Sequence, residues 1–245
     1  MVLVCGMGAS AQDLPALIAK ARPSVLAVGS YSALQTPRFG FRGSGFVVGN
    51  GNRLITNAHV LPERPDGGDA PRTVVLIPTR GGEPQVRAAT IVEVDRARDL
   101  ALLEFEGPPL PALALAANEP VAEGLDVVLM GFPIGGILGF TPVTHRGIVA
   151  SVTAVAPPPP SARDLAPQAV MRVRQGTFDI YQLDAVAYPG NSGGPLLDVQ
   201  TGQVVGVINM VLVKNTRESA LSQPSGITYA IPVRFVDALL TRQRR

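Results

Sequence analysis

Residues 185–198 read AVAYPGNSGGPLLD, a stretch that sets one serine among three glycines, directly ahead of a proline and an apolar run. Glycine tolerates backbone conformations that other residues avoid, so the pattern indicates a tight turn that leads into a short strand. A serine at the tip of such a turn can project toward a substrate, as a nucleophile must. Ser192 is therefore the first candidate for chemistry, and the fold decides which partners can reach it.

Short β-type runs fill most of the 245-residue chain, and 26 glycines and 23 prolines indicate many turns between them. Helical spacing of apolar residues occurs only near the two ends, over residues 13–21 and 233–243. Many short strands without alternating helices predict an all-β fold, either a barrel or a sandwich. The β-type runs lie at residues 24–31, 44–49, 53–56, 73–78, 86–94, 100–105, 126–132, 147–155, 178–186, 194–199 and 203–213.

A polar connector over residues 115–126 divides these runs into two halves of similar size. We therefore expect one half over residues 12–120, which includes the N-terminal helix, and a second over residues 121–245, which includes the C-terminal helix. The proline-rich segment 154–170 predicts a stiff, extended surface loop within the second half.

The first eleven residues, MVLVCGMGASA, form a short apolar run that ends in the small residues Ala9, Ser10 and Ala11. This ending is typical of a signal-peptide cleavage site, although the basic residues that usually open such a signal are missing. The pattern predicts a truncated export signal over residues 1–11. Cleavage there would also remove Cys5, the single cysteine. If the segment is not a signal, the expected location is the cytoplasm.

Composition excludes several kinds of function. The net charge of +2 is too small to indicate a nucleic-acid partner, and no apolar segment approaches the roughly 18 residues of a membrane span. One cysteine and two histidines supply no set of metal ligands. The glycine-rich stretch 43–51 runs into β-type residues and lacks the helix of a dinucleotide site. We expect neither a metal nor a cofactor.

A serine nucleophile needs a base, and only His59 and His145 are available. His145 lies inside a run that reads as a strand, whereas His59 follows the run RLIT at its end. The order Asp99, His145, Ser192 matches the subtilisin type, which needs helices that this sequence lacks. The order His59, Asp99, Ser192 matches the chymotrypsin type, which is all-β. Chain order and fold agree, so the sequence favours His59.

The third member of such a triad must orient the imidazole and stabilise its protonated form. Asp99 opens the strongly apolar run 100–105, whereas Asp95 lies in the charged turn before it. A buried carboxylate belongs at the entry of the strand rather than in a solvated turn. The sequence therefore favours Asp99 over Asp95, and the predicted catalytic residues are His59, Asp99 and Ser192.

The glycines around Ser192 fit acyl-transfer chemistry, in which backbone N–H groups point at the developing oxyanion. Gly190 can adopt a positive φ and supply one N–H group, and Ser192 supplies another, with Asn191 between them. The predicted backbone oxyanion hole is therefore Gly190, Asn191 and Ser192. Gly193 and Gly194 allow neighbouring backbone to pack closely against this turn.

At this point the sequence resembles the trypsin-like (chymotrypsin-fold) serine proteases, and within them the bacterial high-temperature-requirement, or HtrA-like, group. The resemblance implies two antiparallel β-barrels with a catalytic triad in the cleft between them. It also implies a periplasmic or secreted location. The pieces that carry it occur in the order typical of the family: GSGFVV (43–48), LITNAHV (54–60), VDRARDLALLEF (94–105), GFPIG (131–135), THRGIVAS (144–151), LDAVAYPGNSGGPLLD (183–198), VVGVINM (204–210) and TYAIP (228–232).

The resemblance also implies a specificity pocket without charge, so we expect cleavage after small or medium aliphatic residues. Asp184 is the nearest acidic residue, and in relatives its position belongs to the framework. Asn209, one of the pocket residues, is also expected to donate a hydrogen bond to Asp99. The pocket residues carried over by motif are Val186, Ala187, Asn209, Met210, Val211 and Ile227.

The expected function is that of a serine endopeptidase acting on unfolded or extended polypeptides. A non-catalytic, chaperone-like or peptide-binding relative is the alternative. HtrA-like proteins commonly continue into a PDZ domain, so we expect substrate selection by such a domain to be absent or supplied by another chain. They also often form trimers, and a homo-trimer is an assembly that the resemblance allows. Asn191 stands where digestive relatives carry an aspartate that pairs with a new N-terminus. We therefore expect activation by loop ordering rather than by that cut.

Overall fold

The computed structural model describes residues 13–33, 36–62, 71–79, 82–135, 139–155, 178–210 and 227–242. Strands β1 to β6 close into one antiparallel barrel in the order β1-β2-β3-β6-β5-β4, here called the first barrel. Its strands are β1 (Val25–Tyr31), β2 (Phe39–Val48), β3 (Arg53–Thr56), β4 (Arg72–Ile77), β5 (Gln85–Asp95) and β6 (Leu100–Phe105).

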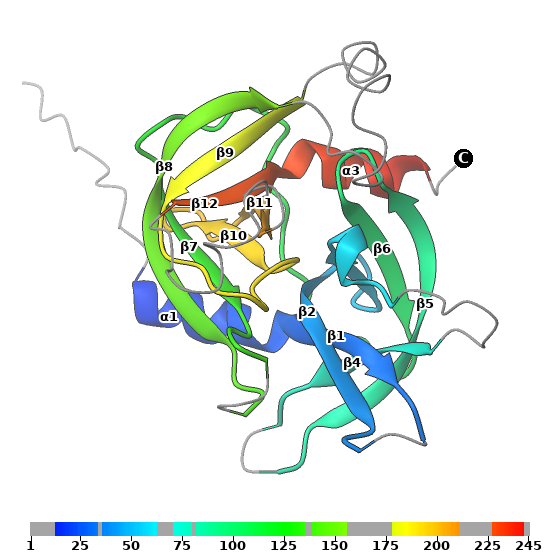
Figure 1. Ribbon diagram of the computed structural model, residues 1–245. Coiled ribbons are helices and arrows are strands. Elements are labelled where there is room, and N and C mark those ends of the chain that lie inside the picture. The colour runs from blue at the N-terminus through cyan, green and yellow to red at the C-terminus, as the bar shows by residue number, and fades with distance from the viewer. Residues whose placement is uncertain are drawn as a thin grey trace, which may run out of the picture.

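A second antiparallel barrel closes in the order β10-β11-β12-β9-β8-β7. The prediction of an all-β fold with two barrels is therefore confirmed, and Figure 1 shows the barrels side by side. The strands of the second barrel are β7 (Asp126–Gly131), β8 (Val143–Val155), β9 (Phe178–Asp184), β10 (Pro195–Asp198), β11 (Val204–Asn209) and β12 (Ile227–Pro232).

Short helices lie near both ends of the described chain, as predicted: α1 (Leu14–Ala21) and α3 (Val233–Arg242). Helix α1 has proline in its first turn, where a missing N–H group costs nothing, and buries Leu17 and Ala21. Helix α3 buries Val233, Val236 and Leu239, which lie on one face at helical spacing. It contacts β6 as well as β11 and β12, so α3 touches both barrels (Figure 1).

Some strands that face the other barrel are buried on both sides, which explains their nearly continuous apolar sequences. In β1, Val25 and Ala27 point into a layer between the barrels, whereas Leu26 and Val28 point into the first barrel. Alternate residues of a strand face opposite sides, so such a strand needs apolar residues at every position. Strand β7 repeats the pattern in the second barrel.

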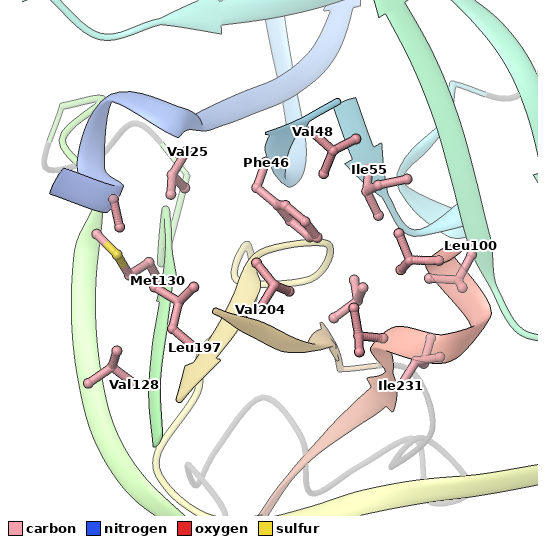
Figure 2. Packing of buried hydrophobic residues seen from close by; sticks show 14 of the residues in the cluster. Val25, Phe46, Val48, Ile55, Leu100, Val128, Met130, Leu197, Val204 and Ile231 are labelled. Atoms are coloured by element: carbon pink, nitrogen blue, oxygen red, sulfur yellow. The ribbon is translucent and has the colours of Figure 1, made fainter. Parts of the chain in front are cut away.

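The layer between the barrels, here called the inter-barrel layer, is a single apolar cluster built from both halves of the chain. Figure 2 shows its side chains facing one another across the seam. Burial of this apolar surface favours one fixed docking of the barrels. The first barrel contributes Val25, Phe46, Val48, Ile55 and Leu100, and the second contributes Val128, Met130, Leu197, Val204 and Ile231.

Three of the sequence predictions fall on residues outside the described ranges. The export signal covers residues 1–11, and the description of the chain begins at residue 13. Most of the proline-rich segment 154–170 lies between the end of β8 and residue 178. Both stay predictions, as does residue Val211 of the pocket.

Replacement of a buried side chain in the inter-barrel layer should destabilise the protein. Ile55 is fully buried in this layer, and Ile55→Ala should lower the free energy of unfolding by about 2–5 kcal/mol because a cavity remains. Ile91 of β5 is 48% exposed, so the matched change Ile91→Ala should cost less than about 1 kcal/mol. Denaturant titrations of both variants measure the difference, and equal costs would contradict the placement of Ile55.

Candidate active site

His59 lies directly after β3, on a short 3-10 turn of Ala58–Val60. Its ring nitrogen Nδ1 is 2.5 Å from Oδ2 of Asp99, and its backbone N–H group donates to Oδ1 of the same carboxylate at 2.9 Å. The carboxylate thus holds both the ring and the backbone of one histidine. Because Nδ1 faces the acid, Nε2 is the nitrogen left for a reacting group, as triad chemistry requires.

Asp99 has a left-handed backbone, with φ at 55°, which is uncommon for a residue other than glycine and is least costly for Asp and Asn. Its carbonyl accepts two hydrogen bonds from the segment before His59, from Nδ2 of Asn57 at 2.9 Å and from the Ala58 N–H group at 3.1 Å. These bonds hold the strained residue in place at the entry of β6. The backbone conformation therefore helps to aim the carboxylate at His59.

The second barrel reaches Asp99 through Asn209 at the end of β11. Nδ2 of Asn209 donates to Oδ2 of Asp99 at 2.7 Å, and Asn209 is fully buried. The expected hydrogen bond between these two residues is thus present in the structure. The same bond turns the Asn209 side chain toward the acid, so it does not serve as a wall of the predicted pocket.

Asp95, the rejected alternative, has a different task. Its Oδ2 lies 2.8 Å from Nη1 of Arg98, and its Oδ1 accepts the Arg98 N–H group at 3.1 Å. Both bonds stay within the turn between β5 and β6. Asp95 therefore stabilises the turn that directly precedes Asp99.

Ser192 is buried to 5% exposure at the turn before β10. Its Oγ accepts the Met210 N–H group at 3.3 Å, and within the described residues it forms no hydrogen bond with His59. Catalytic hydrogen bonds in unliganded sites are often long and tighten when a substrate is bound. The structure thus brings His59, Asp99 and Asn209 into direct contact and supplies Ser192 from the opposite barrel.

In the nucleophile turn, residues 188–194, hydrogen bonds to successive backbone carbonyls hold the chain in place. Every carbonyl from Tyr188 to Ser192 accepts one hydrogen bond, and the donors come from three parts of the chain. They are the Asn191 N–H group to Tyr188 (3.0 Å), the Ile134 N–H group to Pro189 (2.8 Å), Ser44 Oγ to Gly190 (2.6 Å), the Gly194 N–H group to Asn191 (2.9 Å) and the Ser44 N–H group to Ser192 (2.8 Å).

This pattern leaves the N–H groups on the two sides of Asn191 for a ligand. In a planar trans peptide the C=O and N–H groups point in opposite directions, so an anchored carbonyl also aims the next N–H group. The N–H groups of Gly190 and Ser192 donate to no atom of the described residues. The Asn191 N–H group is already bound to Tyr188, so Asn191 enters the predicted oxyanion hole as a spacer and not as a donor.

At two positions of this turn both the backbone conformation and the available space require glycine. Gly190 and Gly193 have φ values of 104° and 86°. A Cβ atom on Gly190 would lie 2.2 Å from the Phe132 carbonyl oxygen, and one on Gly193 would lie 2.1 Å from that of Ser44. Conformation and space both exclude a side chain here.

The Asn191 side chain is fully buried, and its amide has no hydrogen-bond partner among the described residues. It lies against Gly131, where an added Cβ atom would come within 2.8 Å of Asn191 Oδ1. A neutral amide in this position needs no cationic partner, whereas a buried carboxylate would. Activation by loop ordering, without an N-terminal ion pair, stays a prediction.

The structure places the predicted pocket residues unevenly. Ala187 is buried in the core of the second barrel, Met210 packs partly against the same core, and Val186 is 38% exposed. Ile227 opens β12, where it pairs with Asp184, and Asp184 itself is exposed at the end of β9. Val211 lies outside the described residues. Met210 lies beside Ser192, because its N–H group is 3.3 Å from Ser192 Oγ, whereas Ala187 belongs to the core of the second barrel. The specificity pocket therefore stays a prediction.

Three residues that the sequence did not single out also shape the site. Ser44 bonds twice to the nucleophile turn, Ile134 holds the Pro189 carbonyl, and Thr228 donates its hydroxyl to the Ala185 carbonyl at 2.7 Å. Ser44 and Thr228 are fully buried hydroxyl residues inside apolar strands. A lone hydroxyl in such a run was the available signal, because a buried polar group must find a partner.

His145, the alternative base, lies in β8 opposite Leu129, and its ring packs at 5.8 Å against that of Tyr188. Burial lowers the pKa of His145 from its ordinary value of 6.5. Its Nε2 atom is buried and has no hydrogen-bond partner among the described residues. His145 is therefore a half-buried side chain of β8 whose burial favours the neutral ring, and it bonds to neither Asp99 nor Ser192.

His145 should make the protein sensitive to acid. As the pH falls below about 6.5, the unfolded chain takes up a proton at His145 that the folded protein resists, so the free energy of unfolding falls. His145→Gln removes this titration and should lessen the loss of stability between about pH 7.5 and about pH 5.5. Urea midpoints at the two pH values measure the effect. If His145→Gln loses stability as steeply as the wild type, a group other than His145 causes the sensitivity to acid.

No helix in the described ranges is long and apolar enough to cross a membrane. Among the same residues, no group of three or more histidine, cysteine or acidic side chains could hold a metal ion.

The geometry defines a class: an all-β double barrel that carries a histidine–aspartate pair on the first barrel and a serine on a glycine turn of the second. A family model described as a trypsin-like peptidase domain matches residues 43–207. The chain belongs to the family of trypsin-like peptidases, and its similarities point to the HtrA-like members.

Two relatives are mitochondrial serine proteases HTRA2 of fruit flies. The protein of Drosophila willistoni is 28% identical and that of Drosophila pseudoobscura pseudoobscura 29% identical over 200 residues, which cover 82% of this chain. The match covers only 38% of either relative.

Two solved structures show the same fold at high coverage. The Rv3671c protease of M. tuberculosis in its active form is 27% identical, with a TM-score of 0.65 over 92% of this chain and 82% of that chain. Its inactive form is also 27% identical, with a TM-score of 0.63 over 93% of this chain and 92% of that chain. One family fold thus accommodates both active and inactive forms.

Proposed function

We propose that this protein is a serine endopeptidase that cleaves extended polypeptides through an acyl-enzyme intermediate. The single observation that carries the proposal is the hydrogen-bonded chain from Asn209 to Asp99 to His59, beside a serine that accepts a hydrogen bond from Met210, the residue after Asn209. Membership of the trypsin-like peptidases supports the same reading. The alternative, a binding module on the same fold, would not need a carboxylate held in this orientation.

In the first half of the proposed reaction, Oγ of Ser192 attacks the carbonyl carbon of the scissile bond while Nε2 of His59 takes the hydroxyl proton. Asp99 holds the ring so that Nδ1 keeps its proton and the imidazolium is stabilised. The tetrahedral intermediate collapses when His59 returns the proton to the departing amine. The peptide C–N bond breaks, and the acyl group stays on Ser192 as an ester.

In the second half, a water molecule replaces the amine. His59 takes a proton from the water, whose oxygen attacks the ester carbon, and then protonates Oγ of Ser192 as the acid leaves. In both halves the oxyanion is stabilised by the N–H groups of Gly190 and Ser192, which donate to no atom of the described chain. Each such donor is worth about 10²–10³ in kcat in related chemistry.

The proposed substrates are chains without secondary structure. A trypsin-like site binds its substrate as an added strand, so main-chain hydrogen bonds supply much of the affinity. Met210, directly after β11, is the described residue at which such a strand would pair, since its N–H group lies 3.3 Å from Oγ of Ser192. A homo-trimer and a periplasmic or secreted location remain part of the proposal, alongside the export signal of residues 1–11.

The nucleophile is tested by labelling with a serine-directed peptidyl phosphonate. Wild-type protein should incorporate one phosphonate at Ser192 and degrade casein, because His59 activates the hydroxyl. Ser192→Ala should abolish labelling and lower casein cleavage at least about 10³-fold. Mass spectrometry of the labelled protein and release of casein peptides provide the measurements.

Ser151→Ala is the matched control, because its hydroxyl bonds to Thr153 on the exposed edge of β8. This variant should label and cleave like the wild type. A folded wild type that neither labels nor cleaves would overturn the enzyme and favour the binding module.

The lining of the pocket should determine the cleaved bond. Ala187 and Met210 cannot solvate a cation, and Asp184 is exposed at the end of β9, so cleavage should follow valine, alanine or similar aliphatic residues. Sequencing the products of a proteome-derived peptide library by mass spectrometry measures this preference, with Ser192→Ala as the background. A preference for lysine or arginine would show that the assigned pocket is wrong.

A further inference from the structure

We propose that Ser44 is a positioning residue for the oxyanion hole: it acts from the first barrel on the nucleophile turn of the second. The inference rests on the proposed function and names a residue outside the triad. Ser44 lies in β2 and is fully buried. Its hydroxyl group and its backbone both reach residues 188–194.

The hydroxyl of Ser44 joins two loops of the second barrel. Oγ donates to the Gly190 carbonyl at 2.6 Å and accepts the Phe132 N–H group at 3.0 Å. One hydroxyl thus satisfies a carbonyl of the nucleophile turn and an N–H group of the segment after β7. Since a hydroxyl has one donor and two acceptor sites, both bonds can form together.

The backbone of Ser44 adds a second tie at the other side of the nucleophile. Its N–H group donates to the Ser192 carbonyl at 2.8 Å. Its own carbonyl accepts the hydroxyl of Thr56 at 2.7 Å, which links β2 to the end of β3. Ser44 therefore holds the carbonyls on both sides of Asn191 from one rigid strand.

Anchoring the Gly190 carbonyl limits rotation of the backbone around Gly190. Glycine has no Cβ atom, so little besides hydrogen bonding keeps this residue at its φ of 104°. On the other side, the Ile134 N–H group holds the Pro189 carbonyl at 2.8 Å. The N–H group of Gly190 lies between these two anchors. Loss of the Ser44 hydroxyl removes one anchor and leaves the Gly190 carbonyl and the Phe132 N–H group without this partner.

Loss of the Ser44 hydroxyl should affect the transition state of the reaction more than the binding of substrate. The oxyanion forms only as Ser192 attacks, so a less ordered Gly190 N–H group should lower kcat and leave substrate binding nearly unchanged. A residue that merely joined the barrels would instead lower stability and reduce the amount of competent enzyme. The two roles can be separated by comparing kcat per labelled active site with KM.

The test compares Ser44→Ala with Ser24→Ala. Ser24 is 1% exposed and its hydroxyl has no hydrogen-bond partner among the described residues, so the same atom is removed at equal burial. We expect Ser44→Ala to lower kcat about 10- to 100-fold, which is less than the loss of about 10²–10³ for a donor that is removed outright, because the Gly190 N–H group is displaced and not lost. KM should stay within about twofold. Activity on a chromogenic peptide is normalised to active sites titrated with the phosphonate.

A peptide boronic acid supplies a second readout, because its adduct with Ser192 is a tetrahedral anion that fills the oxyanion hole. Its inhibition constant should rise by the same factor as kcat falls in Ser44→Ala. Binding of an uncleaved peptide to Ser192→Ala, with and without Ser44→Ala, should be unchanged. Ser24→Ala should match the wild type in every measurement.

Ser44→Cys is the second variant, in case Ser44→Ala does not fold. Cysteine fills the space of the serine side chain but is a weaker hydrogen-bond donor. The kcat of Ser44→Cys should therefore lie between that of the wild type and that of Ser44→Ala. A kcat for Ser44→Ala within twofold of the wild type, or equal losses in Ser24→Ala, would overturn the positioning role alone. A wild type without any activity would overturn the proposed function and this inference together.

Discussion

The inter-barrel layer is the constraint on which the rest of the structure depends. His59 and Asp99 come from the first barrel, whereas Asn209 and Ser192 come from the second, so the proposed active site cannot assemble unless the two barrels dock in one way. Apolar side chains from both halves fill the layer, and Val25, Phe46 and Met130 are completely buried in it. Close packing resists sliding, because each shift would open voids. The polar contacts across the seam are then added to a docking that is already determined.

Two of those contacts have different consequences. The bond from Asn209 to Asp99 passes between the barrels and orients the acid. The bonds from Ser44 pass the other way and orient the nucleophile turn. Each barrel therefore completes the half of the site that belongs to its neighbour. Neither barrel alone contains a working constellation, even though each closes its own sheet.

Much of this arrangement could be predicted from the sequence, and the limits have physical reasons. Turn residues between short apolar runs indicated the strands, and the order of His59, Asp99 and Ser192 indicated the double barrel. The bond between Asn209 and Asp99 was expected from the resemblance. The left-handed backbone of Asp99 was not predictable, because aspartate carries no local signal for that conformation. The roles of Ser44 and Ile134 depend on contacts between residues far apart in sequence, which one chain without a structure does not reveal.

The conformation of Asp99 also limits which amino acids this position can accept. At φ 55°, asparagine and glycine are the replacements for aspartate that add the least backbone strain. A single-base change reaches either residue from aspartate, so the acid can be lost while β6 and the turn before it keep their shape. Such a substitution at Asp99 would remove the carboxylate and leave the fold almost unchanged. A relative that keeps only the binding surface would show asparagine or glycine here more readily than alanine or valine.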